Sequence, residues 1–213
     1  IKNVLCRIDA GITTSMNWDN IDVNASDNSL ENRQRLISAL KCIPGIPLFL
    51  EAQQTQLIDL QDILNKTLVA HTKTIENKTF CVRAKRNGIH NFSSLDVERF
   101  VGGGLNQAVT SASVKLKEPD VIIHIEIKNK DLFIVSKRHN GLGGFPIATQ
   151  EDVLSLMSGG FDSGVSSYQM IKKGSRTHFC FFNLGGSAHE VGVKQVSYYL
   201  WNKYGSSHKV KFF

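Results

Sequence analysis

The order of apolar and polar positions divides the chain into alternating helical and strand-like segments. Residues 27–43 predict a helix that begins behind an Asp-Asn-Ser sequence and ends before Pro44 and Gly45. Its apolar residues at helical spacing are Leu30, Ile37, Leu40 and Ile43. Short strands are predicted on either side, over residues 19–25 and 46–52. This first unit has too little apolar surface for a core of its own.

A second unit follows, with the predicted order helix, strand, helix and hairpin. The first helix places Leu57, Leu60, Leu64 and Leu68 on one face, and the strand KTFCVRAKR alternates Phe80, Val82 and Ala84 with polar residues. The second helix, residues 93–109, begins with a capping box of Ser93 and Asp96. It contains the triplet Gly102–Gly104, where each glycine costs about 1 kcal/mol relative to alanine. We therefore expect a close backbone approach or a break there. Residues 120–137 form the hairpin, which makes this an α+β unit.

From Asp152 the pattern changes to β-α-β-α-β. The strands are predicted at residues 153–157, 176–183 and from 208, with helices at 164–173 and 189–204 between them. This order is typical of the start of a doubly wound parallel sheet. Such sheets are buried on both faces, and three strands leave apolar faces uncovered, so we expect the chain to be incomplete at both ends. Residues 139–150, HNGLGGFPIATQ, are predicted to be a linker or sharp turn.

Charge and cysteine content narrow the class of protein. The net charge is +6, which favours an anionic partner, although most such surpluses are only solvated surface. The four cysteines are scattered without a C-x-x-C pair, which predicts reduced residues in a cytoplasmic protein. The pair His189-Glu190 begins like a zinc-protease helix, but position 193 is valine. No apolar run approaches 18 residues, so we expect no membrane span.

The stretch VLSLMSGGFDSG, residues 153–164, carries the most specific chemistry. Gly159 and Gly160 allow backbone amides to approach an anion, and Ser158 and Ser163 add hydroxyl groups. The loop has no lysine, unlike a P-loop, and Asp162 fits a Mg²⁺ ion that bridges carboxylate and phosphate oxygens. A loop of this kind suits pyrophosphate as a leaving group, so we expect cleavage of ATP between the α and β phosphates. The alternative is an ordinary strand-to-helix turn.

Longer segments carry a family resemblance. SGGFDS is similar to the loop of PP-loop ATP pyrophosphatases, and KTFCVRAKRNGIHNFSSLDVERFVGGGLNQ resembles a THUMP domain. GGFPIATQEDVLSLMSGGFDSGVSSY and CFFNLGGSAHEVGVKQV resemble the bacterial tRNA 4-thiouridine synthetases, or tRNA sulfurtransferases. The resemblance implies the remainder of an N-terminal ferredoxin-like domain at 1–50, a THUMP domain at 51–140 with similarity from about residue 34, a linker at 141–150, and the first part of a PP-loop domain at 151–213.

The resemblance also implies a reaction and its partners. ATP would adenylate the uridine at position 8 of tRNA, and a persulfide sulfur supplied by a cysteine desulfurase would displace AMP. The family also passes sulfur to thiazole formation in thiamine synthesis, which would add the thiamine sulfur-carrier protein as a partner. The sulfur-carrying cysteines of the family lie further along than residue 213, so we assign no catalytic cysteine and expect residues 1–213 alone to be inactive. Whether the protein forms a homodimer stays open.

Residue by residue, the resemblance carries over two sets of sites. For ATP it implies a catalytic Asp162, which would also hold Mg²⁺ through Mg-ATP, together with Ser158, Gly159, Gly160 and Ser163 of the loop. The adenosine pocket would be lined by Leu156, Met157, Phe181 and Phe182, for which a plain core strand is the alternative. For tRNA the best basic candidates are Arg83, Lys85, Arg86, Lys137 and Arg138.

Two other functions remain open at this stage. One is another PP-loop adenylating enzyme, such as an amidotransferase-linked synthetase or a different tRNA-modifying ligase. The THUMP-like segment argues against the synthetases, and the missing C-x-x-C argues against other thiolating enzymes. The other is a non-catalytic tRNA-binding fragment.

Overall fold

A computed structural model describes residues 1–17 and 20–213, which form two compact units. One unit consists of residues 1–49 together with 139–213, and the other of residues 50–138. Mixed α/β structure with a multi-stranded sheet confirms the predicted fold class. No helix in the described ranges is long and apolar enough to cross a membrane.

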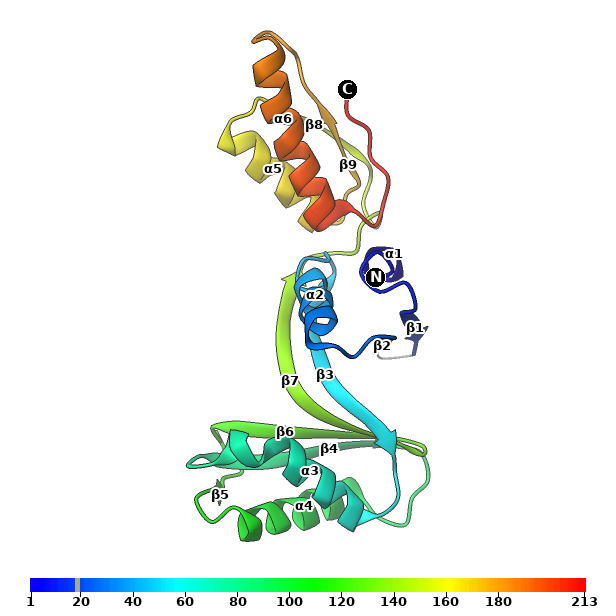
Figure 1. Ribbon diagram of the computed structural model, residues 1–213, viewed down its shortest axis with the longest axis vertical. Coiled ribbons are helices and arrows are strands. Elements are labelled where there is room, and N and C mark those ends of the chain that lie inside the picture. The colour runs from blue at the N-terminus through cyan, green and yellow to red at the C-terminus, as the bar shows by residue number, and fades with distance from the viewer. Residues whose placement is uncertain (18–19) are drawn as a thin grey trace. The chain divides into compact units, whose positions relative to one another are not determined.

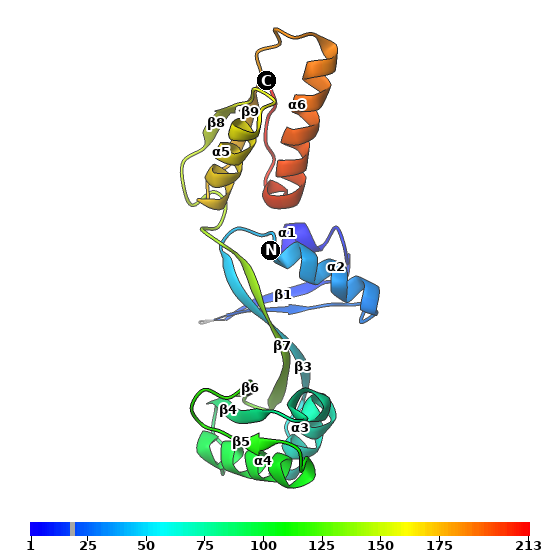
Figure 2. The same cartoon turned by 90° about the vertical axis from the view of Figure 1, so that its left-hand side faces the viewer.

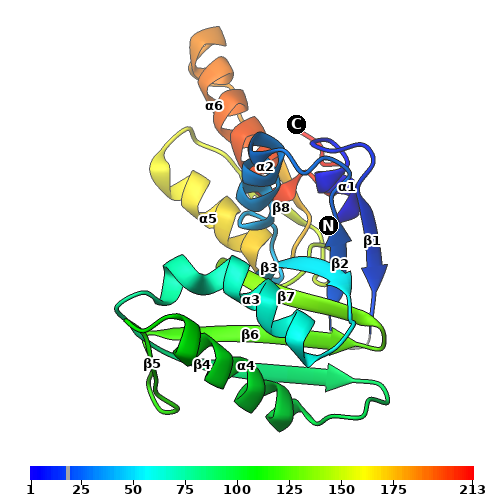
Figure 3. The same cartoon turned by 60° about the horizontal axis from the view of Figure 1, so that its bottom comes forward.

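The unit of residues 50–138 contains most of a five-stranded sheet with the order β3-β7-β6-β4-β5. Strand β4 pairs in parallel with β5 and β6, and β6 pairs antiparallel with β7 as the predicted hairpin. Helices α3 and α4 lie side by side on one face of this sheet (Figure 3). The bounds are β3 Ile46–Gln56, α3 Leu60–Ile75, β4 Thr79–Asn87, α4 Ser94–Ala108, β5 Ser113–Val114, β6 Val121–Lys128 and β7 Asp131–Gly143.

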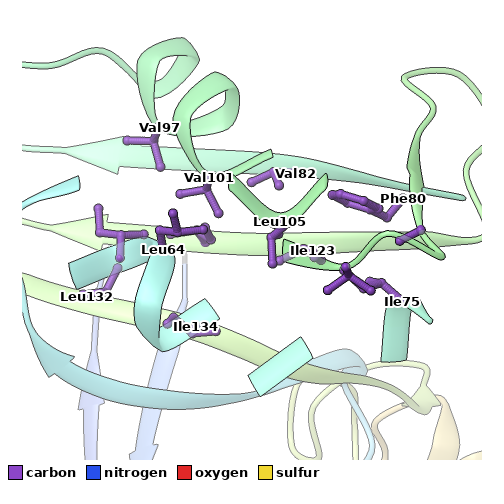
Figure 4. Close-up of a cluster of buried hydrophobic side chains, with 14 of the residues drawn as sticks. Leu64, Ile75, Phe80, Val82, Val97, Val101, Leu105, Ile123, Leu132 and Ile134 are labelled. Carbon is purple, nitrogen blue, oxygen red and sulfur yellow. The ribbon is translucent and has the colours of Figure 1, made fainter. Parts of the chain in front are cut away.

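The core of this unit lies between the two helices and the sheet (Figure 4). Phe80 and Val82 of β4 point into it, as their alternation predicted, and Val97, Val101 and Leu105 enter from α4. Ser93 caps α4 and exchanges hydrogen bonds with Asp96, which confirms the capping box. The glycine triplet does not break the helix.

The N-terminal segment of the other unit is small and is held together partly by polar contacts. It comprises α1 Lys2–Leu5, β1 Thr13–Met16, β2 Ile21–Asn24 and α2 Leu30–Leu40 (Figure 1). Its buried apolar cluster contains Leu5, Ile12 and Leu36. The Asp9 carboxylate accepts hydrogen bonds from Gly11, Ser26, Asp27 and Asn32, and the Ser26 bonds above all lower its pKa to about 2.

For this segment one prediction was wrong and one strand was missed. Leu30 is 70% exposed, because the buried face of α2 runs through Asn32 and Leu36. Strand β1 was not predicted, since its sequence TTSM has no clear alternation. The strand predicted at residues 19–25 is observed as β2, and its first residue, Asp19, lies outside the described residues.

The C-terminal segment is the predicted β-α-β-α arrangement. It comprises β8 Val153–Leu156, α5 Phe161–Lys172, β9 Thr177–Cys180, α6 Ser187–Leu200 and a π-helical turn, Trp201–Gly205. Strands β8 and β9 are parallel, and Phe212 adds a single parallel bridge to Phe179 where a third strand was predicted. Both helices pack on one face around Met157, Ile171, Phe179 and Val193. Leu154 and Leu156 point to the other face and are more than half exposed.

Three boundaries in this region differ from their predictions. Helix α5 begins at Phe161, three residues earlier than expected, so the end of the SGGFDS sequence is helical. Strand β9 ends at Cys180, which places Phe181 and Phe182 in the loop after it. Strand β7 continues to Gly143, so the first residues of the predicted linker are paired strand. The glycines there allow this, because a Cβ on Gly141 would overlap the Ile46 carbonyl.

Candidate functional site

The glycine loop lies where the two parallel strands end. The register pairs Leu156 with Cys180, so the loops that follow β8 and β9 leave the sheet at the same edge. Helices α5 and α6 begin directly after these loops and run beside the strands (Figure 2). Ligands of open α/β sheets bind at this carboxyl edge.

Hydroxyl groups hold the loop in its turn. The Ser163 hydroxyl accepts a hydrogen bond from the Ser158 amide at 3.3 Å and donates to the Gly160 carbonyl at 2.9 Å. The Gly160 amide in turn donates to the Ser158 hydroxyl at 3.3 Å. Gly159 has φ +83, a left-handed conformation that favours glycine. Ser158, Gly159, Gly160 and Ser163 are thus brought together in one compact turn.

Both helices at this edge begin without a side-chain cap. Their N-cap residues are Gly160 and Gly186, whereas Ser29, Asp59 and Ser93 cap α2, α3 and α4. The first N–H groups of a helix have no intrahelical acceptor, and they carry partial positive charge. The uncapped ends of α5 and α6 therefore fit an anion, as the sequence predicted for α5.

The four residues predicted for the adenosine pocket fall into two pairs. Met157 is buried and Phe181 partly buried, and both belong to the cluster under α5 and α6. Leu156 and Phe182 are 61% and 69% exposed. The core interpretation is confirmed for Met157, whose place in the adenosine pocket stays a prediction. Leu156 and Phe182 are too exposed among the described residues for the alternative of a plain core strand.

Asp162 lies in the first turn of α5 and is exposed. Across residues 1–17 and 20–213 there is no group of three or more His, Cys, Asp or Glu side chains that could hold a metal ion. A Mg²⁺ ion at Asp162 would therefore take its remaining ligands from phosphate oxygens and water, which is how proteins usually hold this ion. The four cysteines are free thiols, and only Cys81 is buried.

Sequence reasoning missed one residue at the site, His189. Its Nε2 atom lies 3.0 Å from the Ser158 carbonyl oxygen, and its ring meets the Phe181 ring edge-on with centroids 5.1 Å apart. The neighbouring Glu190 accepts a hydrogen bond from the Asn183 amide at 3.0 Å and pairs with Lys194. The pair His189-Glu190 was the sequence signal that could have indicated this residue, but only its match to a zinc-protease motif was considered.

The basic candidates Arg83 and Arg86 make polar contacts within the protein. Arg83 donates to the Leu116 carbonyl at 3.0 Å and lies 3.6 Å from the Glu98 carboxylate at the edge of β4. Arg86 donates to the Gly88 carbonyl at 2.9 Å, and its Nη1 lies 3.1 Å from His90. These contacts hold the guanidinium groups in place.

Lys85, Lys137 and Arg138 are exposed, as Arg83 is. Burial lowers the pKa of His124 on β6, and Arg138 and Arg83 add to this effect while Glu126 opposes it. Because both arginines act on His124, the structure brings two predicted basic groups from β4 and β7 to the same part of the sheet. Alternation along β4 places Arg83 and Lys85 on the face opposite the helices.

Comparison with known sequences gives matches over both parts of the chain. Residues 58–137 match the THUMP domain family, and residues 148–213 match the family described as thiamine biosynthesis protein (ThiI). The chain is 77% identical over 213 residues to a tRNA sulfurtransferase from Colwellia psychrerythraea, covering all of this chain and 44% of that relative. It is 57% identical to one from Actinobacillus succinogenes, covering 43% of it. The chain thus spans less than half the length of these curated relatives.

Two crystal structures share the fold. A 4-thiouridine synthetase in complex with RNA and bound ATP aligns with a TM-score of 0.81 at 20% identity, over 99% of this chain and 55% of that one. A protein from Pyrococcus horikoshii aligns with a TM-score of 0.80 at 20% identity, over 100% of this chain and 70% of that one. These similarities support the fold described above, in which the glycine loop lies at the carboxyl edge of β8 and β9.

Proposed function

We propose that the protein is an ATP-dependent enzyme that makes 4-thiouridine at position 8 of tRNA. The proposal is supported by the matches to the THUMP and ThiI families and by 77% identity to a tRNA sulfurtransferase. The observation that carries this proposal is the glycine loop. It follows the end of β8, at the same edge as the end of the parallel strand β9, and leads into the uncapped N-terminus of α5. A structural neighbour with bound ATP and RNA supports the same ligands.

Each residue of the loop has a role in this proposal. The amides around Gly159 and Gly160 and the hydroxyls of Ser158 and Ser163 would bind the pyrophosphate portion of ATP. Met157 and Phe181 would form the inner wall of the adenosine pocket, and Leu156 and Phe182 its exposed rim. Asp162 would hold Mg²⁺, which neutralises charge on the departing pyrophosphate. Adenylation would make the uridine C4 oxygen a leaving group. The terminal sulfur of a protein persulfide would attack C4 and displace AMP, and a second thiol would then cleave the S–S bond, which leaves the sulfur on the tRNA and a disulfide on the protein.

The remaining parts of the proposal concern partners and domains. The THUMP-like unit would bind tRNA through phosphate contacts of Arg83, Lys85, Arg86, Lys137 and Arg138, which position the RNA without reading its sequence. A cysteine desulfurase would supply the persulfide, and sulfur transfer to a thiamine sulfur-carrier protein would be a second use. The domain boundaries proposed at residues 50, 140 and 150 are consistent with a THUMP match that ends at residue 137.

A chimera tests the proposed activity. The matching segment of the Colwellia psychrerythraea relative would be replaced by residues 1–213 of this chain, which are 77% identical to it. The chimera would be incubated with ATP, unmodified tRNA, a cysteine desulfurase and cysteine. We expect AMP and 4-thiouridine in equal amounts, measured by chromatography of nucleotides and of digested tRNA. A tRNA with cytidine at position 8 serves as the control and should give neither product.

The same experiment separates the alternatives. If the chimera binds tRNA but releases no AMP, the loop of this chain does not support adenylation and the chain is a binding module. If AMP forms with another acceptor and not with tRNA, the protein is a different PP-loop adenylating enzyme. Residues 1–213 by themselves should bind ATP and tRNA and release no AMP.

A further inference from the structure

We propose that His189 is a positioning residue that holds the glycine loop in the conformation that binds the pyrophosphate portion of ATP. This inference rests on the proposed function, because it assigns a residue to the same site. His189 lies in the first turn of α6, 31 residues after the Ser158 carbonyl that it contacts.

The hydrogen bond has a defined direction. A carbonyl oxygen can only accept, so Nε2 of His189 carries the proton and donates it to Ser158 at 3.0 Å. Ser158 is the residue immediately before the two glycines. Fixing its carbonyl fixes the peptide plane between Ser158 and Gly159, and therefore the direction of the following amides.

The glycines around the ring show how closely it is held. A Cβ on Gly159 would lie 2.9 Å from Nε2 of His189, and a Cβ on Gly185 would lie 2.6 Å from its Nδ1. Gly159 belongs to the loop after β8 and Gly185 to the loop after β9. The imidazole therefore fills the space between the two loops, and both loops need glycine at the point of contact.

Glu190, next to His189 in the first turn of α6, contacts the loop that follows β9. The Glu190 carboxylate accepts from the Asn183 side chain at 3.0 Å, and Lys194 one turn later pairs with the same carboxylate. The His189 ring also packs edge-on against Phe181. One helical turn thus connects the pyrophosphate loop, the aromatic residue of the adenosine pocket and the segment after β9.

The expected consequence concerns the anionic part of the ligand. Without His189, the Ser158–Gly160 segment is free to turn its amides away from a shared anion position. Because His189 is exposed and a net hydrogen bond contributes about 0.5–1.5 kcal/mol, we expect His189→Ala to weaken binding of ATP and of inorganic pyrophosphate by about two- to tenfold. Binding of adenosine should change less, since Met157 and Phe181 remain.

Titration calorimetry of the full-length chimera, with ATP, inorganic pyrophosphate and adenosine as ligands, tests this inference. His189→Gln should restore the affinity for ATP and pyrophosphate, because its side-chain amide can donate to the Ser158 carbonyl. Gln195→Ala, at an exposed position of the same helix, is the matched control and should bind like the wild type. Hydrogen exchange of the Gly159 and Gly160 amides should be faster in His189→Ala and near normal in His189→Gln.

Each outcome has one meaning. Equal losses for adenosine and pyrophosphate, with no rescue by His189→Gln, would show that His189 only stabilises the helix and would overturn the inference. Unchanged ATP affinity in His189→Ala would overturn it as well. A wild-type protein that binds neither ATP nor pyrophosphate would instead contradict the proposed function of the loop.

Discussion

Gly104 of α4 lies against the side chain of Leu64 of α3 so closely that a Cβ on Gly104 would overlap both methyl groups of Leu64. The two neighbouring glycines differ from it. Gly103 faces open space, and a Cβ on Gly102 would make an ordinary contact of 3.8 Å with Val82. Only one glycine of the triplet is therefore required for the packing of α3 on α4.

This contrast predicts opposite effects for two adjacent substitutions. Gly103→Ala should raise the free energy of unfolding by up to about 1 kcal/mol, because alanine is the better helix former and meets no neighbour. Gly104→Ala gains the same propensity but must displace the buried Leu64, at an overpacking cost of about 1–3 kcal/mol. Chemical denaturation should show a more stable and a less stable protein, respectively. Equal effects of the two substitutions would contradict the close contact.

The buried His71 of α3 predicts a pH dependence of stability. The side chain is 4% exposed, neither ring nitrogen has a hydrogen-bond partner of normal geometry among the described residues, and burial lowers its pKa despite the opposing influence of the Val135 carbonyl. The unfolded chain therefore binds a proton that the folded chain does not. Stability from this group is complete above about pH 6.5 and is lost as the pH falls, by at most about 1.4 kcal/mol per pH unit.

Denaturation at about pH 7.5 and about pH 5.5 measures this effect. His71→Leu should reduce the difference in unfolding free energy between the two pH values. His124, whose pKa is also lowered, contributes in the same direction, so the double variant with His124→Gln should flatten the dependence further. An unchanged pH dependence in His71→Leu would show that burial does not lower the pKa of His71.

Asp162 is expected to act on chemistry rather than on tRNA binding. In the chimera described above, Asp162→Ala should lower the rate of thiolation by about a hundredfold or more, the order observed when a preorganised charge-stabilising group is removed. The affinity for tRNA should stay nearly the same, because Asp162 lies in the other compact unit from the basic candidates. Filter binding and single-turnover rates measure the two quantities. Equal losses of both would count against the adenylation role.

The exposed pair on β7 should contribute to phosphate binding. Replacing both Lys137 and Arg138 with alanine should weaken tRNA binding and lower the salt slope, by about 0.9 for each duplex phosphate that the variant no longer neutralises. Lys73→Ala, an exposed change on α3, is the control and should leave the slope unchanged. Binding isotherms at several salt concentrations provide the measurement.

The double variant Lys85→Ala and Arg86→Ala tests two of the three candidates on β4 in the same way. Arg86 already donates to the Gly88 carbonyl, so we expect its loss to affect local structure as well as charge. If affinity and salt slope are both unchanged in this double variant, the assignment of Lys85 and Arg86 to tRNA binding is wrong.

Features that depend on neighbouring residues could be predicted from the sequence. The Ser93–Asp96 capping box, the alternation of Phe80 and Val82, and the hairpin of β6 and β7 all follow from spacings of a few residues. The position of the glycine loop between a strand and a helix follows in the same way. Periods of two and 3.6 residues and local hydrogen bonds determine these elements before any tertiary contact forms.

Features that depend on register and packing could not be predicted. The apolar spacing of α2 included Leu30, but the structure exposes it because the small cluster around Leu5 and Ile12 contacts Leu36. Periodicity indicates that a helix has an apolar face, but the side chains across from it decide which residues that face contains. The extension of β7 to Gly143 likewise depends on pairing with a distant strand.

The features of the candidate site also fall into those that follow from local sequence and those that depend on tertiary contacts. By itself the sequence determined that Ser158, Gly159, Gly160, Asp162 and Ser163 lie where a strand passes into a helix, because their composition and their place in the chain are local properties. Only the tertiary structure decided that His189 would reach the Ser158 carbonyl, that Met157 would be buried and Leu156 exposed, and that Arg83 would pair with Glu98. Those contacts join residues that lie far apart in the chain, and they form only once the strands are in register and the helices are packed on them.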